Sequence, residues 1–179
     1  MDKKKMIIIS SIAAAVIVAI VGVVILLSTV FSGDNGDSTD KAPVSAGGSI
    51  TVNVGSAEAE NGAIVKVPVT VSNNSGFTAS LVNVTFDGKV LEYMGYEKGD
   101  VINDYEFVPA DNAVSILHSE PELKDTTKNG TLYTLKFRVV GKSGEKSEVK
   151  LNIPDDGGFI NLDEKDVVPK ITNGTVTVK

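Results

Sequence analysis

The feature that most constrains this chain is a run of 26 residues without one charged side chain, from Met6 to Phe31. Only a helix satisfies its own backbone polar groups inside a membrane, and about 20 apolar residues are enough to cross a hydrocarbon core of roughly 30 Å. No polar face interrupts the run, as one would in most helices that pack on a soluble core. Residues 6–31 are therefore predicted to form a transmembrane signal-anchor helix.

A cleavable signal peptide is the alternative, because Lys3, Lys4 and Lys5 would also serve as the basic start of such a peptide. The apolar core of a signal peptide is normally only about 7 to 15 residues long and ends in a cleavage site of the Ala-x-Ala kind. The stretch Ser28–Gly33 contains no such site. The length of the run favours a retained anchor over a cleaved peptide.

The three lysines also set the orientation of the predicted helix, since basic residues mark the cytoplasmic side of a membrane span. Residues 1–5 are then a cytoplasmic basic stub, and the rest of this single-pass protein faces the extracellular side. The chain has no cysteine, so an exported domain would be held together by its apolar core alone. That property fits a bacterial cell membrane better than an animal one.

Residues 32–49 are predicted to be a disordered linker, because Gly, Ser, Asp and Thr dominate them and cannot bury a core. Residues 50–179 remain, about 130 residues, which suffices for one domain. Removing residues 1–33, with three lysines and one aspartate, leaves 14 basic and 22 acidic residues and a net charge of −8. Such a surface repels phosphate backbones, so nucleic acid is excluded as a partner.

From residue 50 onward, short runs of β-branched and aromatic residues are separated by turn pairs such as Asn61-Gly62 and Asp87-Gly88. No helical period occurs in this region. The pattern predicts an all-β fold of two packed sheets, whose last strand should pair near the first. Strands are expected at 50–54, 65–71, 79–86, 90–96, 106–108, 113–119, 132–139, 149–153, 159–162 and 175–178.

Few residues are available for catalysis. His118 is the single histidine, so neither a Cys–His pair nor a three-histidine zinc site can form. A Ser–His–Asp arrangement through His118, or a carboxylate pair drawn from residues 155–166, stays open. His118 lies in a predicted strand and the carboxylates lie in a Gly-rich loop, so structural roles and solvation are favoured. We interpret the domain as a binding module and not an enzyme, with no metal site of its own.

Short motifs occur in a fixed order along residues 50–178. They are Val67-Pro68-Val69, Val82 to Asp87, Leu91-Glu92-Tyr93, Gly99-Asp100, Gly130-Thr131-Leu132, Gly157-Gly158-Phe159 and Asn173 to Val178. In the order and spacing of these motifs the region resembles a cohesin domain, the module that receives dockerins in bacterial cellulosome-type assemblies.

The resemblance implies a nine-stranded jelly-roll β-sandwich without catalytic activity, preceded here by the transmembrane helix. The face formed by its third, fifth, sixth and eighth strands would bind a two-helix dockerin. Calcium is expected on the dockerin only, so this chain needs no cofactor. Carried over position by position, the dockerin-binding face comprises Ala79, Leu81, Asn83, Glu106, Val108, Ser115, Leu117, Ser119, Glu120, Lys150 and Asn152.

Two of these positions depart from the usual cohesin pattern. Leu81 stands where many cohesins have Asp, and Val108 stands where many have Tyr, which implies a more aliphatic interface. The alternation within residues 79–86 independently places Leu81 opposite two core valines. In the sixth strand, a slip of one residue would turn Ile116 and His118 outward instead of their neighbours.

Two functions therefore remain. The preferred one is a monomeric, non-catalytic adaptor that tethers dockerin-bearing enzymes or scaffold proteins to the cell surface for polysaccharide degradation. The alternative is a carbohydrate-binding module on a related β-sandwich. Sugar rings stack on exposed aromatic side chains, and this chain has no Trp and only four Tyr. That composition disfavours the alternative.

Overall fold

The computed structural model describes residues 47–179, apart from residues 103, 121 and 123. The predicted transmembrane helix and all but the last three residues of the predicted linker lie outside this range. Every regular element within the range is a β-strand, which confirms the predicted all-β class. The described part of the chain contains no helix that is long and apolar enough to cross a membrane.

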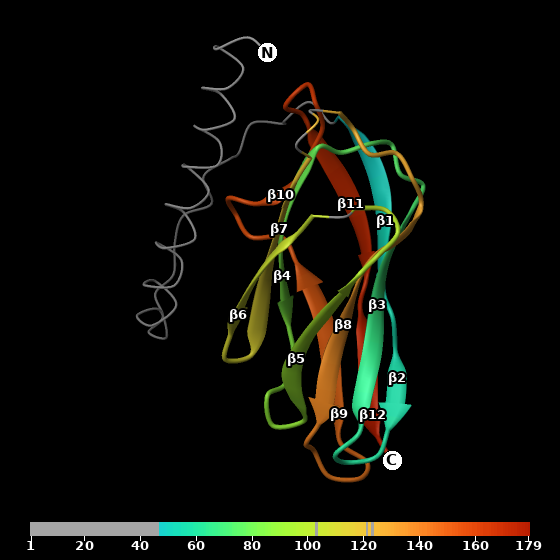
Figure 1. Cartoon of the computed structure of the whole chain (residues 1–179), viewed down its shortest axis with the longest axis vertical. Coiled ribbons are helices and arrows are strands. Elements are labelled where there is room, and N and C mark those ends of the chain that lie inside the picture. Colours follow the sequence, from blue (N-terminus) through green and yellow to red (C-terminus); the bar gives the residue numbers. More distant parts are fainter. Residues whose placement is uncertain (1–46, 103, 121, 123) are drawn as a thin grey trace, which may run out of the picture. The chain divides into compact units, whose positions relative to one another are not determined.

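The described residues form twelve strands (Figure 1). The first six are β1 (Gly48–Val54), β2 (Ala57–Ala59), β3 (Ile64–Ser72), β4 (Ala79–Thr85), β5 (Leu91–Lys98) and β6 (Glu106–Ala110). The other six are β7 (Ala113–Ser119), β8 (Gly130–Val139), β9 (Lys146–Asn152), β10 (Gly158–Ile160), β11 (Asp166–Thr172) and β12 (Gly174–Val178).

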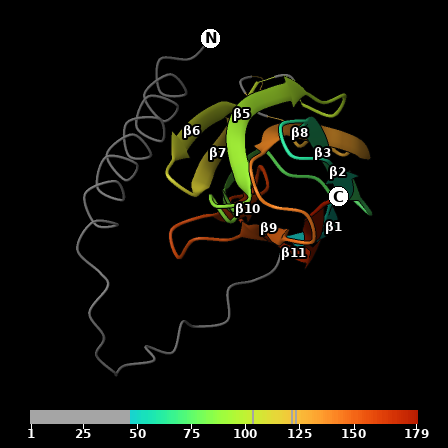
Figure 2. The ribbon, with the colours of Figure 1, turned by 90° about the horizontal axis from the view of Figure 1, so that it is seen from below.

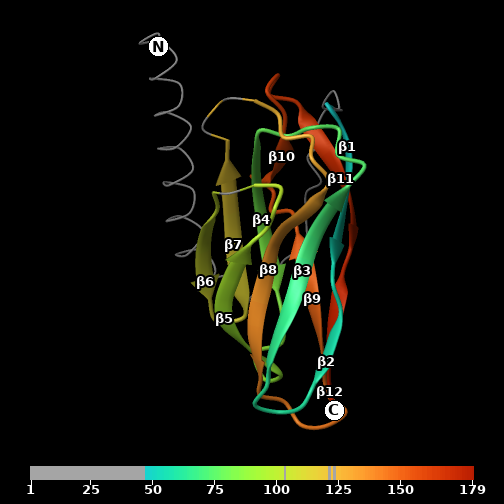
Figure 3. The same cartoon turned by 45° about the vertical axis from the view of Figure 1, so that its right-hand side comes forward.

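The strands make a sandwich of two facing layers, seen along its length in Figure 2 and from the side in Figure 3. One layer contains β5, β8, β3 and β1, and the other contains β6, β7, β4 and β9. The short strand β10 pairs with β4 in the second layer and with β11, which pairs in turn with β1 in the first. The hydrogen-bonded sheet therefore continues around one side of the sandwich.

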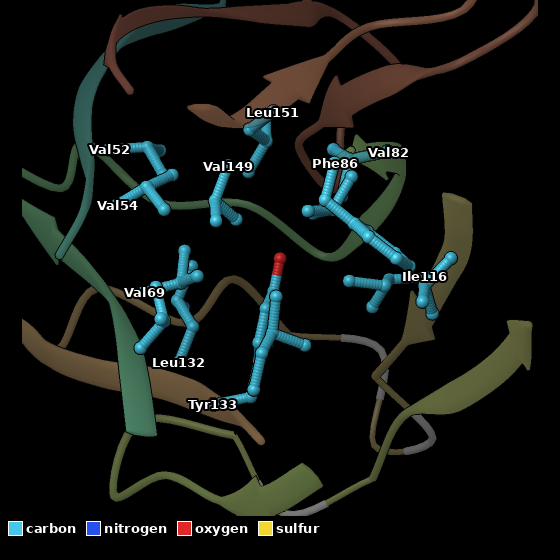
Figure 4. Packing of buried hydrophobic residues seen from close by; sticks show 14 of the residues in the cluster. Val52, Val54, Val69, Val82, Phe86, Ile116, Leu132, Tyr133, Val149 and Leu151 are labelled. Carbon is cyan, nitrogen blue, oxygen red and sulfur yellow. The ribbon is translucent and has the colours of Figure 1, made fainter. Parts of the chain in front are cut away.

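The core lies between the two layers and is built from alternate residues of each strand. In β4, Ser80, Val82 and Val84 are buried, whereas the residues between them are half-buried on the outside. Figure 4 shows valines and leucines of both layers around Tyr133, whose hydroxyl points into the middle of the core. The period-two pattern read from the sequence is therefore the pattern that fills the sandwich.

The other side of the sandwich is closed by side chains, because the edge strands β5 and β6 do not pair with each other. The rings of Tyr96 from β5 and Phe107 from β6 stack with centroids 3.5 Å apart and 14° between their planes. Tyr105 meets Tyr133 edge-on behind this stack, with centroids 5.1 Å apart. These aromatic contacts hold the strands of the candidate site against the rest of the domain.

The strand count differs from the nine that the resemblance implies. β10 overlaps the strand expected at 159–162, whereas β2 was not expected, because its three residues are too few for a period-two pattern to be recognised. β11 was not expected either, because Pro169 and its exposed neighbours Val168 and Lys170 hide the alternation typical of a strand. Proline has no backbone N–H to donate. It therefore loses a hydrogen bond only at a position where a neighbouring strand offers a carbonyl acceptor, so it is tolerated at other positions of a strand.

The final strand was expected to pair near the first, and the structure corrects this. β12 pairs with β9 and β2, and it is the preceding β11 that pairs with β1. The chain changes layers at Asn173–Gly174, where a Cβ on Gly174 would collide with the backbone carbonyl of Gly55. Residues 166–178 are thus divided into β11, which pairs with β1, and β12, which pairs with β9, at the point where Gly174 approaches the backbone of Gly55.

Candidate functional site

The predicted face is formed by four strands that lie side by side in the order β6, β7, β4, β9. Antiparallel pairing sets Leu117 of β7 opposite Leu81 of β4, and Glu106 of β6 opposite Leu117. A second row runs Val108, Ser115, Asn83, Asn152 across the same four strands. Residues that are far apart in the sequence therefore form a single surface.

The register of β7 decides which of its side chains belong to this surface. Ile116 and His118 are buried at 0% and 1% exposure, and Ser115 and Leu117 lie on the outside. The slip of one residue that would have exposed Ile116 and His118 is excluded. The outward set predicted for this strand is the one that the structure has.

Ten of the eleven predicted residues lie on the four strands and point away from the core. The eleventh, Glu120, follows β7, and its backbone N–H donates to the carbonyl of Thr78 over 2.8 Å. Leu81 and Leu117 are half-buried at the centre, whereas Glu106 on β6 and Lys150 on β9 are exposed at the two sides. The arrangement is an apolar centre with amides and hydroxyls beside it and charges at its margins, the usual anatomy of a protein-binding surface.

Sequence reasoning missed several residues of this surface. Thr85 and Ala113 form the next row, and the Asn152 side-chain amide donates to the Thr85 hydroxyl over 3.1 Å. Thr85 continues the alternation of Ala79, Leu81 and Asn83, so that alternation would have revealed it. Residues of β10 also adjoin the face, but their pairing with β4 has no signal in the local sequence.

The two catalytic alternatives find no support in the geometry of the described residues. The His118 ring donates from Nδ1 to the backbone carbonyl of Asp104 over 2.9 Å, and its Nε2 has no hydrogen-bond partner there. The acidic residues of 155–166 are exposed, four of them in loops and Asp166 at the start of β11. Among the described side chains no group of three or more His, Cys, Asp or Glu is placed to hold a metal ion. Nothing here assembles a nucleophile, its base and an orienting carboxylate.

His118 nevertheless gives the domain a testable dependence on pH. Burial lowers the pKa of His118 below its ordinary value, partly offset by the hydrogen bond to Asp104. The folded state therefore favours the neutral ring, whereas the unfolded chain takes up a proton as the pH falls through about 6.5. We expect stability to decrease by up to about 1.4 kcal/mol per pH unit from pH 6.5 downward until the folded pKa is reached.

Thermal melts at pH 7.5, 6.5 and 5.5 would check this, with His118→Phe as the matched variant. Phenylalanine keeps an aromatic ring between Phe77 and Tyr105 but does not titrate. The variant should lose most of the slope between pH 6.5 and 5.5. An equal slope in both proteins would show that another group is responsible.

Fold and surface together define a β-sandwich interaction module with one partly apolar four-stranded face. The Cohesin domain family matches residues 50–178 of this chain. The chain belongs to the cohesin family, whose domains are non-catalytic protein–protein interaction modules.

One curated relative is similar to this chain in sequence. Cellulose-binding protein A of Clostridium cellulovorans is 29% identical over 124 residues, which cover 64% of this chain and 7% of that protein. The chain thus matches only a small part of this curated relative.

Solved structures show the same fold. The sixth cohesin of scaffoldin B from Acetivibrio cellulolyticus, in complex with a Cel5 dockerin mutant, is 23% identical with a TM-score of 0.67, covering 73% of this chain and 99% of that one. A non-cellulosomal cohesin of the archaeon Archaeoglobus fulgidus is 21% identical with a TM-score of 0.64, covering 73% and 91%.

Proposed function

We propose that this protein binds dockerin modules of secreted enzymes or scaffold proteins through the face of β6, β7, β4 and β9. The observation that carries the proposal is the pairing of Leu81 with Leu117 at the centre of a four-stranded surface that also carries Asn83, Ser115 and Asn152. Two half-buried leucines side by side offer an apolar contact for a helix of the partner, and Asn83, Ser115 and Asn152 offer hydrogen bonds beside it. Cohesin–dockerin complexes among the structural relatives support this assignment.

Capture of secreted proteins tests the proposal. The chain is immobilised through an N-terminal tag, exposed to the secreted proteins of its own organism in calcium, and the bound proteins are sequenced by mass spectrometry. We expect the bound proteins to carry dockerin sequences. Capture of proteins without any dockerin, or of soluble polysaccharide alone, would contradict the proposal.

Calcium should be required by the partner and not by this chain. A dockerin whose loops bind calcium loses its fold when the ion is removed, because binding free energy and folding free energy are linked. With a chelator, partner binding should fall below detection, whereas the melting temperature of this domain should stay within about 1 °C. If the chelator lowered the melting temperature of this domain itself, then this domain would bind calcium, which contradicts the prediction.

We also propose that residues 6–31 tether the protein to the cell membrane, with the cohesin domain on the extracellular side. The support is the length of the uncharged run and the three lysines before it. Full-length protein should stay in the membrane fraction after washing with high salt and carbonate. A soluble mature form that begins near Ser32 would show that the run is cleaved.

A further inference from the structure

A second exposed apolar surface adjoins the proposed dockerin face. The described residues expose seven large hydrophobic side chains, and four of these fall within residues 153–168. The other three, Ile64, Met94 and Val140, lie in β3, in β5 and just after β8. We call the four residues the apolar strip: Ile153, Ile160, Leu162 and Val168.

The apolar strip is continuous with the dockerin face through the pairing of β10 with β4. Ile160 lies opposite Ala79, and Gly158 lies opposite Leu81. On the far side of β10, Phe159 and Val167 pair and are both buried, so their neighbours Ile160 and Val168 point outward. β10 thus lies between β4 and β11 in the hydrogen-bonded sheet.

Gly158 leaves an opening between Leu81 and the apolar strip. A Cβ built at Gly158 would have one neighbour within 4 Å among the described atoms, Cγ2 of Ile153 at 3.7 Å. A partner side chain that covers Leu81 can therefore continue over bare backbone toward Ile153. Gly158 adds no side chain between the two surfaces, whereas the Pro154 ring lies beside Gly157, where a Cβ would also meet the backbone carbonyl of Leu81.

Charge limits what can cover the apolar strip. Residues 153–168 carry five acidic side chains and one lysine, a net charge of −4, and all six are exposed. The lysine, Lys165, has its Nζ 3.9 Å from a carboxylate oxygen of Asp163. A matching surface must combine apolar side chains with Lys or Arg, since like charges on facing surfaces are disfavoured.

We propose that the dockerin-bearing partner makes a second contact here, through a basic amphipathic segment that packs on the apolar strip. This inference rests on the proposed function, because the strip extends the same face. β11 pairs with β1 in the opposite layer, so Val168 lies around the side of the sandwich from Leu81. β10 lies between β4 and β11, so we assign the apolar strip to a segment of the partner other than the one that covers Leu81 and Leu117.

The test measures the affinity of the full chain for the dockerin-bearing protein identified by the capture experiment. Val168→Lys should weaken binding about tenfold, by losing an apolar contact and repelling a basic segment, and Val168→Asp should weaken it only about threefold. Ile64→Lys is the matched control, since Ile64 is 58% exposed and Val168 is 54% exposed, but Ile64 lies on the opposite layer. It should change the affinity less than about twofold.

A second variant guards against misfolding of a strand. Leu162 lies outside β10 and β11, so its replacement does not disturb a strand. Leu162→Lys should weaken binding, as Val168→Lys does. Replacing Asp155 and Asp156 with Asn should lower the association rate and make it less dependent on salt, because these carboxylates steer a basic segment.

If Leu81→Asp abolishes binding while Val168→Lys and Leu162→Lys bind like Ile64→Lys, the second contact is wrong and the proposed function stands. If the capture experiment yields no dockerin-bearing protein, the proposed function fails and the second contact fails with it. A wild-type dimer that Val168→Lys dissociates, seen by light scattering, would assign the apolar strip to a second copy of this chain.

Discussion

Replacing Leu81 or Leu117 by Asp is expected to weaken dockerin binding at least about thirtyfold. Each change puts a carboxylate at the centre of the face, where the partner helix removes water and offers no charge to pair with. Changes at a central interface residue commonly cost about 2 kcal/mol or more, which corresponds to this factor in affinity. Titration calorimetry with the captured dockerin, in calcium, measures the effect directly.

The same two variants should fold normally, because both side chains point away from the core. Positions of this kind usually change stability by about 0.5 kcal/mol or less, although half-buried leucines sit toward the upper end. If both variants bind as tightly as wild type, the assignment of the face is wrong. If either variant unfolds, then the substituted side chain points into the core and the assignment of its outward direction is wrong.

Val84→Asp is expected to unfold the domain or lower its melting temperature by about 15 °C or more. Val84 is fully buried in β4 between the two layers. Its replacement removes apolar contacts and places a carboxylate in the core without a partner, a combination that exceeds about 4 kcal/mol. A loss of that size is a large share of the total stability of about 5–15 kcal/mol of an ordinary domain.

The adjacent substitution Asn83→Asp is the matched control. It puts the same carboxylate one residue away on the same strand, but on the outer face. The melting temperature of Asn83→Asp should stay within about 3 °C of wild type. The two variants introduce the same carboxylate at adjacent positions on opposite sides of the sheet. Equal effects at positions 83 and 84 would contradict the register of β4.

The alternation of Ser80, Val82 and Val84 with Leu81 and Asn83 could be predicted from the sequence because β4 is covered on one side only. A strand of that kind has a strict period of two, and the period fixes the direction of every side chain. In β7 the same alternation left two possibilities for which side chains face outward. The burial of His118 shows that Ser115 and Leu117 do. The centre of the candidate face was therefore predictable.

Long-range pairing was not predictable in the same way. Nothing local in Gly158–Ile160 says that these residues lie beside β4, although this pairing brings Ile160 next to Ala79. β11 was missed because Pro169 and two exposed neighbours hide its strand pattern. The layer change at Gly174 depends on a close approach to Gly55, which only the folded chain reveals.

The most direct test of the central claim is a map of amide chemical-shift changes on residues 47–179 when calcium-loaded dockerin is added. The largest changes should fall in β4, β6, β7 and β9, around Leu81 and Leu117, and should disappear with a chelator. Changes concentrated in β3 and β8, on the outer side of the opposite layer, would contradict the account.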